Sequence, residues 1–307
     1  VLAALQVVRT LKVEGITIRR PIWAVSFNDE EGSRFQTGML GSRAFVGELD
    51  LEDWRRRGVA EAMAAAGFDF ERLSAARQID GVGAYLELHI EQGPALEWSG
   101  ADLGIVTAIT GMLGFRARFA GEANHAGTTP MELRRDALAG ASKAVLALRD
   151  EARARPDMTA NVGVIQVEPG GFNVIPGSAE FTIDVRSPTP EGFERIDGFV
   201  RETLARIAAE EDLRLELAET HRKPPVALDD GLQSALEDAA RAEGARTLRL
   251  PSGAGHDAMV LAHHVPAAML FVPSRGGISH SPEEYTSPEL CELGARVLAG
   301  AVRSLLS

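Results

Sequence analysis

The stretch VGAYLELHIEQGP, residues 82–94, starts as an apolar run and ends in a polar, turn-forming tetrad. A short apolar run bounded by turn residues predicts a buried strand, here over residues 82–89. Because side chains alternate along a strand, His89 and Glu91 fall on the same face. Open α/β sheets carry their ligand sites where polar loops follow the strand ends, so this stretch predicts an α/β fold with a site at the edge of its sheet.

Residues 21–32, PIWAVSFNDEEG, repeat this arrangement closer to the N-terminus. The apolar run over residues 21–27 predicts a second buried strand, which is followed by Asp29, Glu30 and Glu31. Adjacent carboxylates repel each other unless a positive charge lies beside them. A divalent metal meets that need by binding one carboxylate and leaving the other free as a base. A solvated acidic turn is the alternative that composition leaves open.

A third polar stretch, VPSRGGISHSP at residues 272–282, contains paired glycines and a histidine. The glycines let backbone amides approach a ligand, and the short loop presents His280. With Glu31 and His89, this histidine completes a set of carboxylate and imidazole groups of the kind that holds zinc or another first-row divalent ion. Each histidine taken alone is more often a satisfied core or surface residue than a ligand.

The order of predicted strands and helices in the middle of the chain differs from that at its ends. Its elements follow the order βαββαβ, the split-βαβ pattern in which helices cover an antiparallel sheet. The strands are expected over residues 113–119, 160–167, 179–185 and 213–217, and the helices over residues 133–152 and 190–211. We therefore expect an inserted α+β domain at residues 108–221. The flanking pieces, residues 1–107 and 222–307, then form one α/β domain in which helices flank a central mixed sheet.

The two outer pieces hold the remaining expected elements. Helices are expected over residues 1–15, 51–66, 231–243 and 288–306, and strands over residues 103–109 and 267–272. The chain opens with Val1 instead of methionine and enters its first helix without an N-cap residue. We therefore expect that a segment precedes Val1 in the complete protein.

The charge balance limits the possible partners. The 307 residues carry 32 Lys and Arg against 44 Asp and Glu, and this net charge of -12 gives no attraction to phosphate backbones or anionic lipid surfaces. Nucleic acid and membrane partners are therefore not expected, and no apolar run approaches the roughly 20 residues that span a bilayer. The single cysteine, Cys291, cannot form an internal disulfide, so we expect a cytoplasmic location.

Five motifs occur in order along the chain: NDEEGSRF, LHIEQGP, GEANHAGTTPMELRRDA, NVIPG followed by DVR, and SRGGISHSPEE. Together they resemble the dinuclear metal amidohydrolases that comprise N-carbamoyl-L-amino acid hydrolases, allantoate amidohydrolases and β-ureidopropionases. The resemblance runs over essentially the whole chain, and five ordered motifs are far more specific than any single one. It implies hydrolysis of the C–N bond of an N-carbamoyl amino acid.

The resemblance also implies a role for each matched residue. It implies that Glu31, His89 and His280 are metal ligands. Glu30 is implied as the general base that deprotonates a water molecule and passes the proton to the leaving nitrogen. The family's substrate-binding positions fall on Gln92, His125, Asn173, Arg186, Gly276 and Gly277.

Three of these positions lie in the inserted domain. Arg186 and Asn173 would clamp the substrate carboxylate, for which a guanidinium fork is well shaped. In the resembled family, a histidine such as His125 commonly completes the active site of a partner subunit and stabilises the tetrahedral oxyanion, which makes it catalytic as well. Without the motifs, Arg186 is equally an exposed strand residue and Asn173 a turn former. His256 and Asp257 in GAGHDA are interpreted as the start of a helix, with no role assigned.

The resemblance implies a centre of two divalent ions, for which zinc, manganese, cobalt and nickel all accept the ligand set. It further implies a homodimer formed through the inserted domain, which would also serve as a lid, and a small carboxylate substrate. The family's upstream histidine and bridging aspartate have no counterpart in this sequence. We therefore expect the metal centre of this chain to be partial or absent, because such sites need about three or four protein ligands.

Other functions remain open at this point. Allantoate is the alternative substrate. An inactive fragment, or a binding protein that holds a carboxylate without hydrolysing anything, is the alternative outside catalysis. A related aminoacylase or dipeptidase is a third possibility, which the HIEQG and HAGTTPM motifs disfavour. No motif fixes the preferred side chain of the substrate, because specificity depends on pocket walls and domain closure.

Overall fold

The computed structural model describes residues 1–306, and its chain divides into two units. Unit 1 comprises Val1–Ile109 and Ala227–Ser307, and unit 2 comprises Thr110–Val226. The predicted boundaries lie a few residues before both of these crossings. No helix in the described part of the chain is long and apolar enough to cross a membrane.

Unit 1 is built on a mixed sheet. Its main path has the order β1 (Tyr85–Ile90), β12 (Ala267–Val272), β2 (Leu103–Ile109) and β10 (Val226–Ala227), and β11 (Thr247–Ser252) also pairs with β2. β1 runs parallel to β12, and β11 runs parallel to β2, whereas β12 and β2 are antiparallel. The predicted mixed sheet is therefore confirmed.

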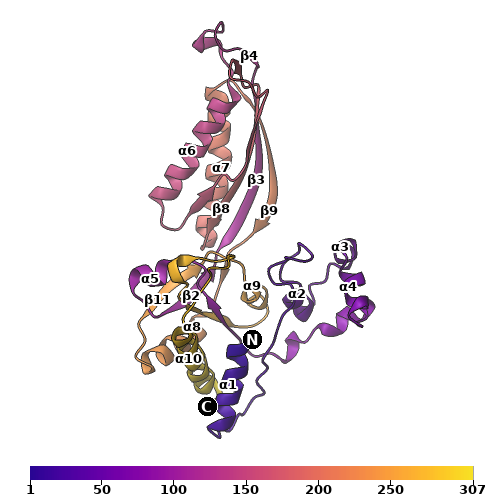
Figure 1. Cartoon of the computed structure of the whole chain (residues 1–307), viewed down its shortest axis with the longest axis vertical. Coiled ribbons are helices and arrows are strands. Elements are labelled where there is room, and N and C mark those ends of the chain that lie inside the picture. The colour runs from indigo at the N-terminus through magenta and orange to yellow at the C-terminus, as the bar shows by residue number, and fades with distance from the viewer. Residues whose placement is uncertain (307) are drawn as a thin grey trace. The chain divides into compact units, whose positions relative to one another are not determined.

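Helices cover both faces of this sheet. Alternate residues of β12 enter different cores: Leu270 and Val272 pack in one, and Met269 and Phe271 in the other. The first core is closed by α1 (Leu2–Val13), α8 (Asp230–Ala242) and α10 (Pro288–Leu306), with α10 packed between the other two (Figure 1). The second core includes residues of α5 (Ala95–Ser99) and α9 (Asp257–Leu261). A strand that is buried on both faces has a continuous run of apolar residues, and residues 267–272 form such a run.

The predicted strand over residues 21–27 is wrong. These residues form no strand, and Trp23 is 50% exposed. The run is held by side chains: the ring of Phe27 lies 5.5 Å from that of Phe45 and 6.3 Å from that of Tyr85. An apolar run becomes a strand only where another strand edge accepts its backbone, and β12 is the only strand that pairs with β1 among the described residues.

The predicted helix over residues 51–66 is also divided. It forms α3 (Leu51–Arg56) and α4 (Val59–Ala65), separated at Gly58, whose φ of 84° is incompatible with an α-helix. With α2 (Leu40–Val46) and the 3-10 helix η1 (Phe70–Ala76), these helices enclose Trp54, which has no exposed surface. A second 3-10 helix, η2 (Ile79–Gly81), leads into β1.

Unit 2 has the predicted βαββαβ order. Its antiparallel sheet has the order β5 (Thr159–Asn161), β8 (Ser178–Ser187), β3 (Gly111–Ala120) and β9 (Arg214–Lys223), and β6 (Ile165–Glu168) also pairs with β8. Two helices, α6 (Ala137–Ala154) and α7 (Pro190–Glu210), lie side by side on one face (Figure 1). The predicted strand over residues 160–167 is two short strands in the structure.

Two minor elements complete unit 2. A two-stranded ladder pairs β4 (Asn124–His125) with β7 (Val174–Ile175), at the end of the unit where β3 ends and β8 begins (Figure 1). A 3-10 helix, η3 (Met131–Leu133), follows β4. The ladder continues the antiparallel hairpin of β3 and β8 outward, since Gly121 N–H donates to the carbonyl of Gly177 at 2.8 Å.

Replacing Phe181 by alanine is expected to destabilise unit 2 by about 3–5 kcal/mol. The side chain has no exposed surface and packs with Phe119 in the core beneath the two helices, so its loss leaves a cavity. The midpoint of urea unfolding measures the effect. Phe172, which is fully exposed, is the matched control, and Phe172→Ala should unfold like the parent chain. Equal midpoints for the two variants would show that Phe181 is not a core residue.

Candidate metal centre

The acidic stretch predicted as a metal site forms a compact loop. Asp29 adopts a left-handed conformation, with φ of 52°, and its Oδ1 accepts a hydrogen bond from Arg34 N–H at 3.0 Å. Met39 N–H donates to the carbonyl of Glu30 at 2.8 Å, which closes the loop. As a result, Glu30 is half-buried and the neighbouring Glu31 is exposed.

Glu31 meets His280, which comes from the far end of the chain. The Nε2 atom of His280 lies 3.4 Å from Glu31 Oε1 and 3.3 Å from Gln92 Nε2. Gln92 also donates to Ser279 Oγ at 3.1 Å, while the backbone N–H of His280 donates to Glu284 at 3.2 Å. Three of the predicted site residues are therefore brought together by loops separated by up to 249 positions in sequence (residue 31 to residue 280).

β1 contributes the second part of the site. Its alternation places Tyr85, Glu87 and His89 on one face, opposite the leucines that enter the first core. Glu87 and His89 lie beside His256, and one possible ligand atom from each of the three falls within 4.8 Å of the others. The rings of His89 and His256 are in edge-to-face contact, with centroids 4.6 Å apart.

The carboxylates of this region are held in an unfavourable environment for negative charge. Burial, together with the charges of Asp257 and Glu31, raises the pKa of Glu30 to about 7. Burial and the charge of Asp257 likewise raise the pKa of Glu87 to about 7. Burial also raises the pKa of Asp257 itself. Such shifts are common at functional sites, where a cation or a proton must balance the buried charge.

The imidazole of His256 is held in an environment that keeps it neutral. Burial and the neighbouring His89 lower the pKa of His256 to about 3, so this ring is neutral at physiological pH. Its Nδ1 atom is buried without a hydrogen-bond partner. Among the described residues, no ion pair joins a lysine or arginine to Glu30, Glu87 or Asp257 (within 4.0 Å). A neutral imidazole beside uncompensated carboxylates fits a divalent cation.

The two parts form one electrostatic cluster. Glu30 is influenced by Glu31 from its own loop and by Asp257 from α9. The pKa of Glu284 is lowered by hydrogen bonds from Ser279 and His280 and also by the charge of His89. His89 and His280 therefore both lower the pKa of the same carboxylate, that of Glu284.

The predicted glycines lie in η4 (Arg275–Gly277), with positive φ values of 64° and 68°. Gly276 N–H donates to Glu97 Oε2 at 2.6 Å, and Gly277 N–H donates to the carbonyl of Ser274 at 2.9 Å. An added Cβ at Gly277 would lie 2.8 Å from the backbone nitrogen of Pro94. Both N–H groups are thus used within the protein, and only the carbonyl oxygens are left to contact a substrate.

His125 and Asn173 are neighbours in unit 2. His125 pairs with Val174 across the β4–β7 ladder, and Ala126 N–H donates to the carbonyl of Asn173 at 2.9 Å. Both residues are exposed, and the His125 Nδ1 atom accepts the N–H of Gly127 at 3.0 Å. Among the described residues, no hydrogen bond involves the Nε2 atom of His125. This ring nitrogen is therefore available to a bound molecule.

Arg186 lies at the other end of the same unit. Its guanidinium donates to both oxygens of Asp184, at 2.8 and 3.0 Å, and this hydrogen bonding raises its pKa. β8 begins at Ser178, near the ladder that carries Asn173, and reaches Arg186 eight residues later, roughly 26 Å away at about 3.3 Å per residue. Arg186 and Asn173 of one chain therefore lie at opposite ends of unit 2, and the predicted carboxylate clamp stays a prediction.

Sequence reasoning missed Glu87 and left His256 and Asp257 without a role. His256 occupies the N-cap position of α9, as expected, yet its side chain makes no capping bond and its Nε2 lies 2.7 Å from Ser252 Oγ. The sequence could have indicated Glu87, because this residue stands two positions before His89 and therefore lies on the same face of the strand. His264, by contrast, lies outside this cluster and pairs with Glu48 at 3.2 Å.

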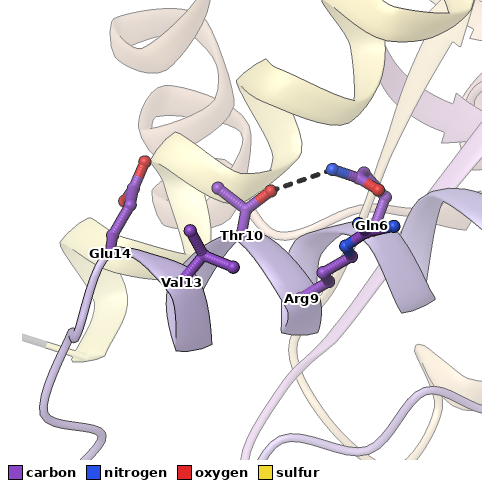
Figure 2. A pocket seen from close by; sticks show the side chains of 5 residues that line it. All are labelled: Gln6, Arg9, Thr10, Val13 and Glu14. Carbon is purple, nitrogen blue, oxygen red and sulfur yellow. Dashed lines mark hydrogen bonds between the residues drawn. The ribbon is translucent and has the colours of Figure 1, made fainter.

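Unit 1 also has hollows on its surface. A cavity of about 960 Å³ follows the outer edge of β1, and its lining includes Trp23, Phe27 and Glu87. The carboxylate of Glu87 therefore borders a space large enough for a small molecule. The second hollow, on the surface of α1, is lined by Gln6, Arg9, Thr10, Val13 and Glu14 (Figure 2). Its side chains include no imidazole and one carboxylate, so it offers no metal-binding set.

Comparisons with known proteins extend over nearly the whole chain. Residues 1–304 match the model of peptidase family M20/M25/M40. The chain is 42% identical over 311 residues to an N-carbamoyl-L-amino acid amidohydrolase of Geobacillus stearothermophilus. This alignment covers 99% of the present chain and 76% of the relative. It is 38% identical over 312 residues to an allantoate amidohydrolase of Bacillus subtilis strain 168, with the same two shares.

Solved structures are similar over the same extent. A hydantoinase/carbamoylase family amidase from Burkholderia multivorans is 38% identical and superposes with a TM-score of 0.87, covering 100% of this chain and 75% of that chain. A second such amidase, from Burkholderia ambifaria, is 34% identical with a TM-score of 0.88 and the same coverage. The predicted combination of a mixed-sheet unit and an inserted α+β unit is thus shared with solved structures.

Proposed function

Because this chain belongs to peptidase family M20/M25/M40, we propose that it is a metal-dependent amidohydrolase that cleaves the ureido C–N bond of an N-carbamoyl-L-amino acid. Relatives named for this activity are 42% and 37% identical over 99% of the chain. The observation that carries the proposal is the contact between Glu31 and His280, in the unit that also holds the half-buried Glu30 and His89. Allantoate is the second candidate substrate, since an allantoate amidohydrolase is 38% identical.

In this proposal Glu31 and His280 hold one divalent ion, and His89 belongs to a second. A bound ion would polarise the ureido carbonyl and lower the pKa of a water molecule. Glu30 takes the proton of the attacking water and returns it to the leaving nitrogen, and a pKa of about 7 suits a group that must do both. The reaction consumes one water and yields the amino acid, carbon dioxide and ammonia. Zinc, manganese, cobalt and nickel are the candidate metals.

The residues on the family's substrate-binding positions would recognise the substrate's polar groups. Gln92 reaches the His280 side chain and lies where a ureido group would bind. The backbone carbonyls of Gly276 and Gly277 line the same loop. Arg186 provides the charge that a substrate carboxylate requires, with Asp184 holding its guanidinium in place.

We further propose that the active enzyme is a homodimer in which His125 and Asn173 reach the site of the partner copy. Their position supports this, because they stand together on the exposed ladder roughly 26 Å from Arg186 along β8, from a rise of about 3.3 Å per residue. One copy therefore cannot bring all three to one small substrate. A dimer supplies both ends of the unit to each site. We propose a cytoplasmic location, because Cys291 is exposed and forms no disulfide.

The proposal predicts ammonia release that depends on a divalent metal. After chelation and dialysis, release from an N-carbamoyl-L-amino acid should fall to background, and adding zinc, manganese, cobalt or nickel should restore it. Allantoate, an N-acetyl amino acid and a dipeptide complete the substrate panel. Ammonia from allantoate alone would select the second candidate, and cleavage of the acetyl or peptide substrate alone would contradict both. Binding of the carbamoyl substrate without ammonia, in the metal-loaded protein, would show a binding protein instead.

A further inference from the structure

His280 stands on the loop of residues 278–287, which joins η4 to α10. Its backbone has φ of 55°, in the left-handed region that residues other than glycine rarely adopt. Backbone strain of this kind persists only where surrounding contacts hold it, and it is common at functional sites. The groups that hold the backbone of His280 therefore decide where its ring lies.

One carboxylate oxygen provides those contacts. Glu284 Oε2 accepts hydrogen bonds from the backbone N–H of His280 at 3.2 Å and from the Ser279 hydroxyl at 2.8 Å. The Ser279 hydroxyl in turn accepts a hydrogen bond from Gln92 Nε2 at 3.1 Å. We propose that Glu284 is a positioning residue that fixes the backbone of His280 and thereby aims the imidazole at Glu31. This inference rests on the proposed function only for the role of His280 as a metal ligand.

Glu284 has a firm base, because the chain that follows it is fixed to the end of β12. Thr286 Oγ1 donates to the carbonyl of Pro273 at 2.8 Å, and Arg275 N–H donates to the carbonyl of Tyr285 at 2.9 Å. The guanidinium of Arg275 also lies 4.5 Å from the centre of the Tyr285 ring, within the range of a cation–π contact. All six residues of β12 are buried, so these contacts tie the base of the loop to the interior of unit 1.

The hydrogen-bond pattern separates positioning from two other roles that a carboxylate could have. Both bonds end on the same oxygen of Glu284, and the amide oxygen of glutamine also accepts two hydrogen bonds. Glu284→Gln therefore keeps both bonds and removes the negative charge, whereas Glu284→Ala removes both bonds and the charge. A role through charge or through direct metal binding is lost in both variants, whereas positioning is lost only with alanine.

Zinc binding to the full chain, freed of metal by chelation, tests the proposal. Glu284→Ala should weaken binding of the zinc ion held by His280 by about 10–100-fold, the usual cost of losing a group that orients a metal ligand. Glu284→Gln should bind zinc like the parent. Titration calorimetry gives the dissociation constants, and the relevant step is the one that His280→Ala abolishes. Glu283→Ala is the matched control, because this exposed neighbour pairs with Ser281 and should leave zinc binding unchanged.

Crystal structures of the metal-free variants give a readout that requires neither metal nor turnover. In Glu284→Ala the φ of His280 should leave the left-handed region. Its Nε2 atom should then lie farther from Glu31 Oε1 than the 3.4 Å of the parent. In Glu284→Gln the backbone and the ring should stay in place.

The outcomes separate this inference from the proposed function. Parental zinc affinity or an unmoved His280 in Glu284→Ala would overturn it, even if the enzyme hydrolyses its substrate, and so would equal losses of affinity in Glu284→Gln and Glu284→Ala. A loss in the alanine variant alone would support it, even if no substrate is turned over. If the parent binds no zinc, the crystal structures decide by the position of His280. Should Glu284→Ala fail to fold, weaker zinc binding by Ser279→Ala supports the proposal, and unchanged binding refutes it.

Discussion

Replacing Glu30 by glutamine is expected to lower kcat for ammonia release by about 10²–10⁴-fold, the usual contribution of a general acid–base group. Glutamine keeps the size of the side chain but cannot accept the proton of the attacking water. KM should change little, because the proposed substrate contacts come from Gln92, Arg186 and the partner's His125. Metal content should also be retained, since Glu31 and not Glu30 is the proposed ligand.

Stability provides a second readout for the same variant. The pKa of Glu30 is raised by burial and by the charges of Asp257 and Glu31, so its charge is a cost to the folded state. Glu30→Gln should therefore keep the thermal midpoint of the parent or exceed it while activity falls. Glu52→Gln, the same change on the exposed face of α3, is the matched control and should alter neither. An active Glu30→Gln enzyme with unchanged kcat would remove Glu30 from the mechanism.

Mixing two inactive variants is expected to restore activity. Glu30→Gln damages the site in its own unit 1, whereas His125→Ala should damage the site of the partner copy. A mixed dimer then contains one site with both residues intact. Random reassociation of equal amounts makes half of the dimers mixed, so about one quarter of parental activity should return.

The control for this experiment places both changes in one chain. In a mixed dimer of the double variant Glu30→Gln, His125→Ala with the parent chain, one site lacks only Glu30 and the other lacks only His125, so both should be inactive and mixing should leave only the activity of the parent dimers. Separate incubation of each single variant sets the background. Recovery no greater than the sum of these backgrounds, in samples shown to have exchanged subunits, would place His125 and Glu30 in the same copy or remove His125 from the reaction.

Local patterns predicted the elements that pack against the two cores. The strand expected over residues 267–272 coincides with β12, and the strand expected over residues 103–109 coincides with β2. In both cases the apolar residues face helices on the two sides of the sheet, so burial and pattern agree. The βαββαβ order of unit 2 was predicted for the same reason, because alternate residues of β8 are buried beneath α6 and α7.

The failures have a tertiary origin. Residues 21–27 have the composition of a strand, yet no strand edge pairs with them in the structure. Gly58 interrupts a stretch that helix propensity alone would continue. His256 could not be placed from its spacing, because its approach to His89 depends on how α9 packs against β1. The separation of Arg186 from Asn173 follows from the direction of β8, which motif order does not reveal, and the clamp predicted for them stays a prediction.

Anomalous X-ray diffraction at the zinc edge, on crystals of the chain loaded with zinc, tests the metal centre most directly. We predict one peak bonded to Glu31 and His280 and a second bonded to His89, with bond lengths of about 2.0–2.2 Å. Zinc found only on surface carboxylates or on His264, with none bonded to Glu31, His89 or His280, would contradict it.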